Sequence, residues 1–486
     1  MNDRAPATAE RDAHAWAGWV LAGILILATV LRIHHLGGWS LEQDELYTLR
    51  DATDFGASSS GPGITARPVY YVLQHVLLAI FPATPLALRI PAMVFGVLGV
   101  WLTWRVARSL SGVAAAAVAS LLVAISPWHL YASQFARYWT LVYVLALGAY
   151  WLLPAALASD RPRTLVATAL LLALGALTHP TFLFPLPGVV IALCLVRDRE
   201  RWRWRWPSAN AWRWLWGPLA TFAIGGAVLL RFTDHGRALN EATQRGMTES
   251  FRIIPGMIQW IAPAVAVAAV LCALWLAVRE RDERRAAWGR MTLLGGVTGL
   301  VALLAAGTRS AIYADYGMAL LPLAYVAVGL GVASIASRAG QESAALVWGV
   351  TLLLVATSLP GTVSHLIDGT RFDYRPAYRY AASRAPGRLT VGWPVIVHQH
   401  YAPHARFAEL RADTVWLNRV LAQEGASGIW LVTSAHRDGR IMSGNGVDAW
   451  MLAHCRPVLL TGRPRLDYRQ YDVELSSCAV DRVASD

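Results

Sequence analysis

The chain has 486 residues, of which 56% are hydrophobic and only 15% are charged, and so few charges cannot cover the surface of a soluble protein of this size. The net charge is +12, and all 43 basic residues are arginines. Because the arginines lie between long apolar runs, they indicate the cytoplasmic loops of a membrane protein and exclude a nucleic-acid-binding surface as their explanation.

Apolar runs occupy most of the first 360 residues. A helix needs roughly 20 residues to cross the hydrocarbon core of a bilayer, and about eleven runs approach or reach that length. We therefore predict an all-α polytopic membrane protein with about 11 transmembrane helices, the first of which is an uncleaved signal anchor. The runs are 15–33, 87–104, 113–128, 138–156, 164–178, 182–196, 214–231, 254–278, 291–308, 317–336 and 344–360.

The apolar segment 68–81 is too short to be counted as a span. It has about 14 residues and carries Gln74 and His75, which predicts an interfacial or re-entrant helix. The stretch 34–86 then forms one periplasmic loop.

The arginine-rich links set the orientation. With the N-terminus in the cytoplasm, all four links face the cytoplasm, as the positive-inside rule requires. We therefore predict a multi-pass protein of the bacterial inner membrane with a cytoplasmic N-terminus. The links are Arg105/Arg108, Arg161/Arg163, 197–206 and 279–285.

The composition changes after residue 360, where short β-like runs alternate with helical stretches. This alternation predicts a small α/β domain over 361–486, after a transmembrane domain over 1–360. An odd number of spans places the small domain in the periplasm. The β-like runs are 388–397, 428–433, 458–461 and 471–475, and the helical stretches lie near 374–385, 413–424 and 447–455.

Two cysteines, Cys455 and Cys478, lie in this C-terminal region, 23 positions apart. In an oxidising periplasm, two thiols in one small domain pair if their Cα atoms come within about 7 Å of each other. The alternative is two small residues that are buried independently.

The first periplasmic loop contains an acidic pair, Asp44 and Glu45, shortly after the first membrane helix. Glycosyl transfer needs a carboxylate that takes the proton of the acceptor hydroxyl while the anomeric carbon loses its leaving group. An acid at the membrane surface also suits a sugar donor that is anchored in lipid. The alternative interpretation is a solvated loop acid without a catalytic role.

Further motifs follow this acidic pair in a fixed order. They are Asp44-Glu45-x-x-Thr48, Arg67-Pro68-Val-Tyr-Tyr71, Ala87-Leu-Arg-Ile-Pro91, Gly112, Ser126-Pro-Trp-His129, Ser133-Gln-Phe-Ala-Arg137-Tyr-Trp139 and Thr178-His179-Pro180. This succession resembles the GT-C superfamily of integral-membrane glycosyltransferases. It looks closest to the bacterial branch that contains the protein O-mannosyltransferases and the lipid A aminoarabinose transferases. The resemblance covers residues 15–200 and extends more weakly to 309–325.

The resemblance implies many membrane helices, juxtamembrane helices in the first periplasmic loop, and an active site on the periplasmic face. It places Asp44 at the family's catalytic or metal-contacting position, with Glu45 as the acid beside it. It also implies that Arg67 and Arg137 bind the donor phosphate, which is chemically reasonable because guanidinium groups bind phosphate oxygens in a bidentate manner. Arg309 is a third candidate for phosphate binding.

Four more residues are candidates for lining the active-site cavity, namely Tyr71, Gln134, His179 and Tyr313. A single histidine at a helix end, such as His179, is also commonly a capping or interface residue. Many bacterial relatives have a glutamate where Phe135 stands here, so the resemblance leaves a divalent metal cofactor unknown.

The sequence therefore predicts an enzyme that moves a sugar from a polyprenyl-phosphate carrier to an acceptor glycan, lipid or protein on the periplasmic face. The alternatives are a non-catalytic transporter of lipid-linked glycans and an O-antigen polymerase or ligase. A transporter should carry ionisable residues at mid-membrane depth, and a polymerase should carry its large loop late in the chain. The early acidic loop favours the transferase.

Overall fold

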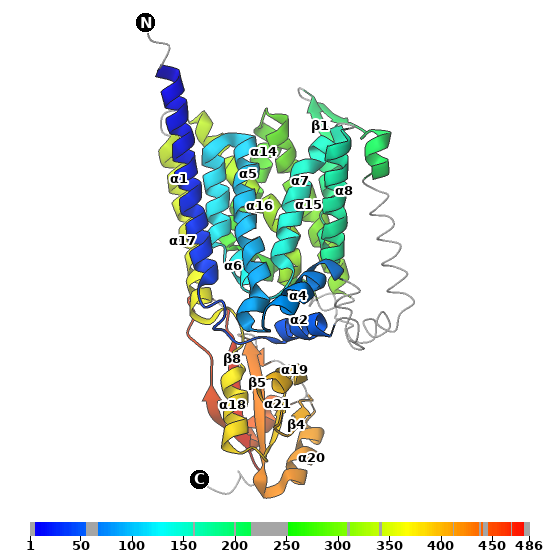
Figure 1. The fold of residues 1–486 in the computed structure, drawn as a ribbon, viewed down its shortest axis with the longest axis vertical. Helices are drawn as coiled ribbons and strands as arrows, with labels where there is room; N and C mark the ends of the chain where they lie inside the picture. The colour runs from blue at the N-terminus through cyan, green and yellow to red at the C-terminus, as the bar shows by residue number, and fades with distance from the viewer. Residues whose placement is uncertain are drawn as a thin grey trace. The chain divides into compact units, whose positions relative to one another are not determined.

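Figure 1 shows the computed structural model, which describes residues 5–54, 67–158, 161–198, 201–214, 251–308, 312–339, 343–411, 413–436, 439–440, 446–467 and 469–480. The chain divides into two compact units. The first comprises Met1–His34, Asp54–Phe81 and Arg89–Thr362. The second comprises His35–Thr53, Pro82–Leu88 and Val363–Asp486, so that parts of the predicted first loop fold with the C-terminal region.

The first unit is a bundle of apolar helices, several of which begin at a proline, where the missing N–H and the fixed φ are tolerated. Its described elements are α1 (Ala5–Ile33), α4 (Pro68–Ile80), α5 (Pro85–Ile125), α6 (Pro127–Ser133), α7 (Trp139–Ala158), α8 (Pro162–Thr178), η1 (Pro180–Leu183), α9 (Leu186–Cys194), β1 (Leu195–Asp198), β2 (Arg201–Trp204), α13 (Ile253–Ile261), α14 (Pro263–Arg279), α15 (Glu283–Gly307), η2 (Ala314–Leu320), α16 (Leu321–Arg338) and α17 (Ser343–Asp368).

Six helices of the described ranges are long and apolar enough to cross a membrane, or seven if the bent pair α13 and α14 counts as one span. The helices α4, α8 and α9 are apolar but shorter, and the predicted run 214–231 lies outside the described residues except for Trp214. The structure confirms a largely helical protein with several apolar spans. The count of about eleven stays a prediction.

The long helix α5 is in fact two helices that fold back on each other. Its break lies at Ser111 and Gly112, and Gly112 has φ +80° and ψ −165°, a conformation that is open almost only to glycine. The Arg32 side chain lies beside Gly96 and also donates to the Ala124 carbonyl at 3.0 Å. A straight helix would separate these two positions by roughly 40 Å, so α5 supplies the two separate helices that the sequence predicts.

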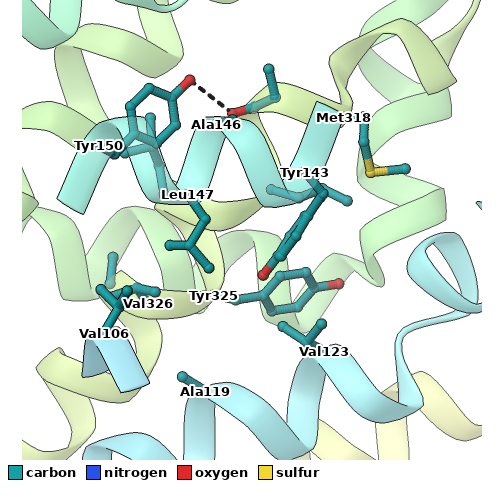
Figure 2. Packing of buried hydrophobic residues seen from close by; sticks show 14 of the residues in the cluster. Val106, Ala119, Val123, Tyr143, Ala146, Leu147, Tyr150, Met318, Tyr325 and Val326 are labelled. Carbon is teal, nitrogen blue, oxygen red and sulfur yellow. Dashed lines mark hydrogen bonds between the residues drawn. The ribbon is translucent and has the colours of Figure 1, made fainter. Parts of the chain in front are cut away.

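Figure 2 shows three tyrosines of the bundle core, Tyr143, Tyr150 and Tyr325, and each of their hydroxyl groups has a hydrogen-bond partner. Tyr143 shares a 2.8 Å hydrogen bond with Thr103, Tyr325 donates to Ser126 at 2.6 Å, and Tyr150 donates to the Ala319 carbonyl at 3.1 Å. A buried hydroxyl without a partner costs about 1–3 kcal/mol, so these bonds fix the register between helices that are distant in the sequence.

The arginine-rich links gather at one end of the bundle. Arg197, in β1, bonds to the Val278 carbonyl near the end of α14, and Arg338, at the end of α16, donates to the Arg279 carbonyl at 2.8 Å. Residues from the break in α5 and from the end of α7 share a cavity of about 670 Å³ with Arg205 and Arg284. The Trp-Arg repeat forms the antiparallel hairpin of β1 and β2, which Figure 1 shows at this end.

The second unit contains an α/β domain with a central sheet of order β4-β3-β5-β8-β7. Strands β3, β4 and β5 are parallel, whereas β8 runs antiparallel to both β5 and β7. The elements are α2 (Gln43–Thr53), α18 (Arg375–Arg384), β3 (Leu389–Gly392), α19 (Val395–Tyr401), β4 (Phe407–Glu409), α20 (Thr414–Glu424), η4 (Gly425–Ser427), β5 (Ile429–His436), β6 (Gly439–Arg440), α21 (Val447–His454), β7 (Cys455–Leu460) and β8 (Asp472–Cys478).

The predicted strand over 388–397 is wrong in its second half. Strand β3 ends at Gly392, and Val395 opens helix α19. Val395, Ile396 and Val397 favour strands by residue type, but Ile396 and Val397 are buried in α19, so tertiary packing overrides the local preference.

A disulfide joins Cys455, the first residue of β7, to Cys478, the last residue of β8, and the two residues face each other in the antiparallel ladder.

We expect reduction of this bond to lower the free energy of unfolding of the domain by about 3 kcal/mol, because it releases a long loop in the unfolded chain. Denaturation with and without reductant measures this loss. The double replacement Cys455→Ser/Cys478→Ser should retain activity in the folded protein, and free thiols at both positions in the oxidised, denatured chain would contradict the bond.

Candidate active site

Helix ends of the first unit bring together an arginine–aromatic cluster, which we define as Arg67, Tyr71, Arg137, Tyr138 and His179. Arg67 precedes Pro68 at the start of α4, and Arg137 and Tyr138 lie between α6 and α7. His179 ends α8 and precedes Pro180. Helix ends leave backbone groups without intrahelical partners, which suits a binding site.

The ring of Tyr138 is the centre of this cluster. The guanidinium carbon of Arg67 lies 5.1 Å from the centroid of this ring, and that of Arg137 lies 5.4 Å from it. Arg137 Nη1 also donates to the Tyr71 hydroxyl at 2.9 Å, and the His179 ring stacks on Tyr138 at 4.7 Å. Two guanidinium groups beside one ring repel each other, and an anion bound between them would relieve that repulsion.

His179 is a neutral hydrogen-bond donor in this environment. Burial, together with the charges of Arg67 and Arg137, holds the pKa of His179 well below its usual range. Its Nδ1 accepts from the Thr181 backbone N–H at 3.3 Å and lies 2.7 Å from the Thr181 hydroxyl. Since Nδ1 accepts a backbone N–H, the neutral ring carries its proton on Nε2.

Three buried polar atoms of the cluster have no hydrogen-bond partner among the described residues, namely Arg67 Nε, Tyr138 Oη and His179 Nε2. Burial raises the pKa of Tyr138 above its usual range, against the opposing charges of Arg67 and Arg137, so the hydroxyl keeps its proton. All three atoms can therefore donate. Buried donors without partners are rare in native proteins, and their concentration here marks a place for an acceptor-rich ligand.

The position of Arg137 is fixed by the end of α1. Gln134 donates from Nε2 to the backbone carbonyls of Arg32 and His34, at 2.8 Å each, and caps that helix. The buried Arg32 side chain donates to His129 Nδ1 at 2.9 Å. The predicted cavity residue Gln134 thus positions the loop that carries Arg137.

Two tyrosines stand at the start of η2, and the structure places Tyr316 beside the cluster. The Tyr313 ring is 53% exposed, whereas Tyr316 lies 5.3 Å from the His179 ring and 5.1 Å from Trp139. The candidate Arg309 lies outside the described residues. The sequence interpretation missed Tyr138 and Tyr316, although both stand within or beside the motifs that pointed to Arg137 and Tyr313.

In the second unit, the two acids of the pair have different surroundings. Asp44 is half-buried in the first turn of α2, where negative charge is favoured. Glu45 is fully buried, and its Oε2 accepts from Arg371 Nη1 at 3.1 Å. Both side chains of this ion pair are almost completely shielded from solvent, so Glu45 anchors the loop to the segment that follows α17.

Glu42 completes this anchor. Its Oε1 accepts from the Phe372 N–H at 2.6 Å. Burial raises the pKa of Glu42 to about 8, although Arg371 and the Phe372 N–H oppose the shift. Glu45 provides the charge that matches Arg371. Asp44, the other acid of the predicted acidic pair, takes no part in the ion pair between Glu45 and Arg371.

Metal ligands are not assembled in the part of the chain that the structure describes, since no three His, Cys, Asp or Glu side chains group there. Phe135, at the position of the relatives' glutamate, is buried and stacks on Tyr131 at 4.9 Å. The described residues therefore assign no ligands to a metal ion.

A family model and several solved structures resemble this chain. The family model described as "dolichyl-phosphate-mannose-protein mannosyltransferase" matches residues 62–215, a range that contains Arg67, Arg137 and His179. The chain resembles the GT-C superfamily of the ArnT and protein mannosyltransferase type, as its motifs predict. No curated protein sequence matches it.

Solved structures share the fold. ArnT from Cupriavidus metallidurans in the apo state is 14% identical, with a TM-score of 0.55 over 95% of this chain and 98% of that one. ArnT from the same organism bound to undecaprenyl phosphate is 15% identical, with a TM-score of 0.53 over 97% and 99%. The apo oligosaccharyltransferase of Archaeoglobus fulgidus is 13% identical, with a TM-score of 0.51 over 87% and 70%. At these identities the likeness concerns the fold.

Proposed function

We propose that this protein transfers a sugar from a polyprenyl-phosphate carrier to an acceptor on the periplasmic face of the inner membrane. The observation that carries the proposal is the arginine–aromatic cluster, in which two guanidinium groups, the Tyr138 hydroxyl and His179 Nε2–H converge. A phosphate monoester or diester offers the negative charge and the acceptor oxygens that such a cluster needs. The shared fold of an ArnT structure that holds undecaprenyl phosphate supports this ligand class.

In the proposed reaction, the Asp44 carboxylate takes the proton of the acceptor hydroxyl. The acceptor oxygen then forms a bond to the anomeric carbon as the bond from that carbon to the phosphate oxygen breaks. The electron pair leaves with the polyprenyl phosphate, whose added negative charge Arg67 and Arg137 bind. The Tyr138 hydroxyl and His179 Nε2–H donate to the same oxygens.

The two parts of this assignment have different support. The role of Asp44 follows from its place in the sequence and from the engagement of Glu45 with Arg371. The role of the arginines follows from the geometry of the cluster. Arg309 stays a sequence-based candidate for phosphate binding, and Tyr71 and Tyr313 stay candidates for lining the cavity.

The surroundings of the buried Arg32, in α1, argue against the alternative of a transporter. Arg32 donates to the carbonyls of Ala124 and Val123, at the end of the second helix of α5, and to His129. These bonds satisfy carbonyls that a helix end leaves open, so Arg32 acts as a cap rather than as part of a path for a substrate.

The orientation gives a prediction of its own. Helix α8 begins beside Arg161 in the arginine-rich links and ends at His179, so a helix of 17 residues, roughly 25 Å, separates the links from the cluster. We expect reporter fusions after residues 60, 235 and 365 to give periplasmic signals, and fusions after 205 and 284 to give cytoplasmic signals. A cytoplasmic signal at 365 would show that the predicted number of spans is wrong by one.

The function is tested by mass spectrometry of envelope glycolipids and glycoproteins from a deletion strain, combined with transfer assays of the purified protein in lipid nanodiscs. We expect the deletion to remove one sugar modification, and plasmid-borne wild-type protein to restore it. An unchanged envelope, together with no turnover of any polyprenyl-phosphate sugar, would exclude the proposed function.

A further inference from the structure

The C-terminal domain contains a cleft that the proposed reaction does not use. It lies beside β4, the edge strand of the sheet, and helix α20, both labelled in Figure 1. Its volume is about 690 Å³, within the range of small-ligand sites, about 300–1,000 Å³. Apolar residues of the domain core form its floor, namely Leu389, Ala408, Leu410 and Val420.

Two indole rings form the walls of this cleft. Trp393 follows the end of β3, and Trp416 stands on the first turn of α20. Both side chains are half-buried. The Arg411 guanidinium carbon lies 5.7 Å from the Trp416 ring centroid. Half-buried tryptophans offer large, rigid apolar faces at little cost in conformational entropy.

Three exposed polar side chains, Glu409, Arg411 and Gln423, surround the mouth of the cleft. Trp416, Val420 and Gln423 share one face of α20, because residues three or four positions apart lie on the same side of a helix. Glu409 and Arg411 carry opposite charges, so the mouth has no net charge. It therefore offers both donors and acceptors without attracting an anion or a cation.

We propose that this cleft binds a neutral glycan. A sugar ring has an apolar face of C–H groups and a rim of hydroxyl groups that both donate and accept hydrogen bonds. The indole rings match the face, and the carboxylate, guanidinium and carboxamide match the rim. Within the proposed function, on which this role would rest, the glycan belongs to the acceptor, but binding itself does not require transfer activity.

A peptide added to the sheet as a further strand is the main competing occupant. Strand β4 has only three residues, and its hydrogen-bonding edge toward β3 is already in use. The free edge offers too few backbone groups for a stable added strand. The glycan therefore fits the cleft better.

Binding can be measured on the full chain in lipid nanodiscs by saturation-transfer-difference NMR, with neutral tri- and tetrasaccharides of hexoses and N-acetylhexosamines as probes. We expect transfer to the ring C–H protons of at least one probe. Trp416→Ala and Trp393→Ala should weaken its affinity tenfold or more, and Gln423→Ala about threefold. Tyr380→Ala is the matched control, because Tyr380 is a partly exposed aromatic residue of α18 outside the cleft.

The exposed replacements Gln423→Ala and Glu409→Gln keep the test valid if a tryptophan variant fails to fold. Asp44→Asn should bind the glycan normally even where transfer is lost, so the two proposals can fail separately. No saturation transfer to any probe, or equal affinity in wild type and all cleft variants, would overturn the glycan site. So would strand-forming peptides that bind in the cleft while the saccharides do not.

Discussion

Asp44→Asn is expected to lower the turnover of sugar transfer on the order of a hundredfold or more, with little change in the affinity for the donor. Asparagine keeps the size and the hydrogen-bonding capacity of aspartate but cannot take the proton of the acceptor hydroxyl, and the loss of a general base typically has this magnitude. The assay is single-turnover transfer from a polyprenyl-phosphate sugar by the purified protein. Near-normal turnover at equal expression would remove Asp44 from the mechanism.

Glu45→Gln is the matched control, because it changes the neighbouring acid in the same way. Glu45 is buried against Arg371, and removal of one partner from a buried ion pair typically costs about 3–5 kcal/mol. We therefore expect Glu45→Gln to lower the free energy of unfolding strongly, whereas the half-buried Asp44→Asn leaves it nearly unchanged. Stability measured beside activity thus separates the anchoring acid from the catalytic acid.

The sequence could not make this distinction. Asp44 and Glu45 are neighbours with the same chemistry, and the partner that separates their roles, Arg371, is 326 positions away. Only the folded loop shows that Glu45 faces inward. The same limit applies to Gln134, whose carbonyl partners at the end of α1 lie about 100 positions earlier in the chain.

Local patterns were sufficient where structure depends on nearby residues. The expected helix near 413–424 is α20, Thr414–Glu424, which Asp413 caps by accepting the Val415 N–H at 2.9 Å. The short segment 68–81 forms the 13-residue helix α4. By contrast, β4 has only three residues and no pattern of its own, because pairing with β3 defines it.

The difference between Tyr313 and Tyr316 has a related cause. Tyr313 and Tyr316 are three positions apart in one motif, and no periodicity applies within so short a turn. The structure places Tyr316 at His179 because the last residues of α8 and the turn η2 meet there. Arginines are more predictable, because a buried guanidinium group near a helix end has few roles besides capping and anion binding.

Arg67→Ala and Arg137→Ala are each expected to reduce transfer by about ten- to a hundredfold, because each removes charge-assisted hydrogen bonds that are worth about 1.5–3 kcal/mol. These bonds strengthen as the phosphate gains charge, so turnover should fall more than donor affinity. Lysine at either position should restore activity only in part, since it keeps the charge but loses the planar fork of donors.

The two arginines share the ring of Tyr138, so their effects should not add. The guanidinium carbons lie 5.1 and 5.4 Å from the same ring centroid, and the double variant should lose less than the product of the single losses. Arg205→Ala is the matched control, because Arg205 is an exposed arginine of the arginine-rich links and lies outside the cluster. It should leave turnover unchanged. Donor affinity and turnover that stay at wild-type values in both single alanine variants would disprove the phosphate role, whatever the behaviour of Asp44.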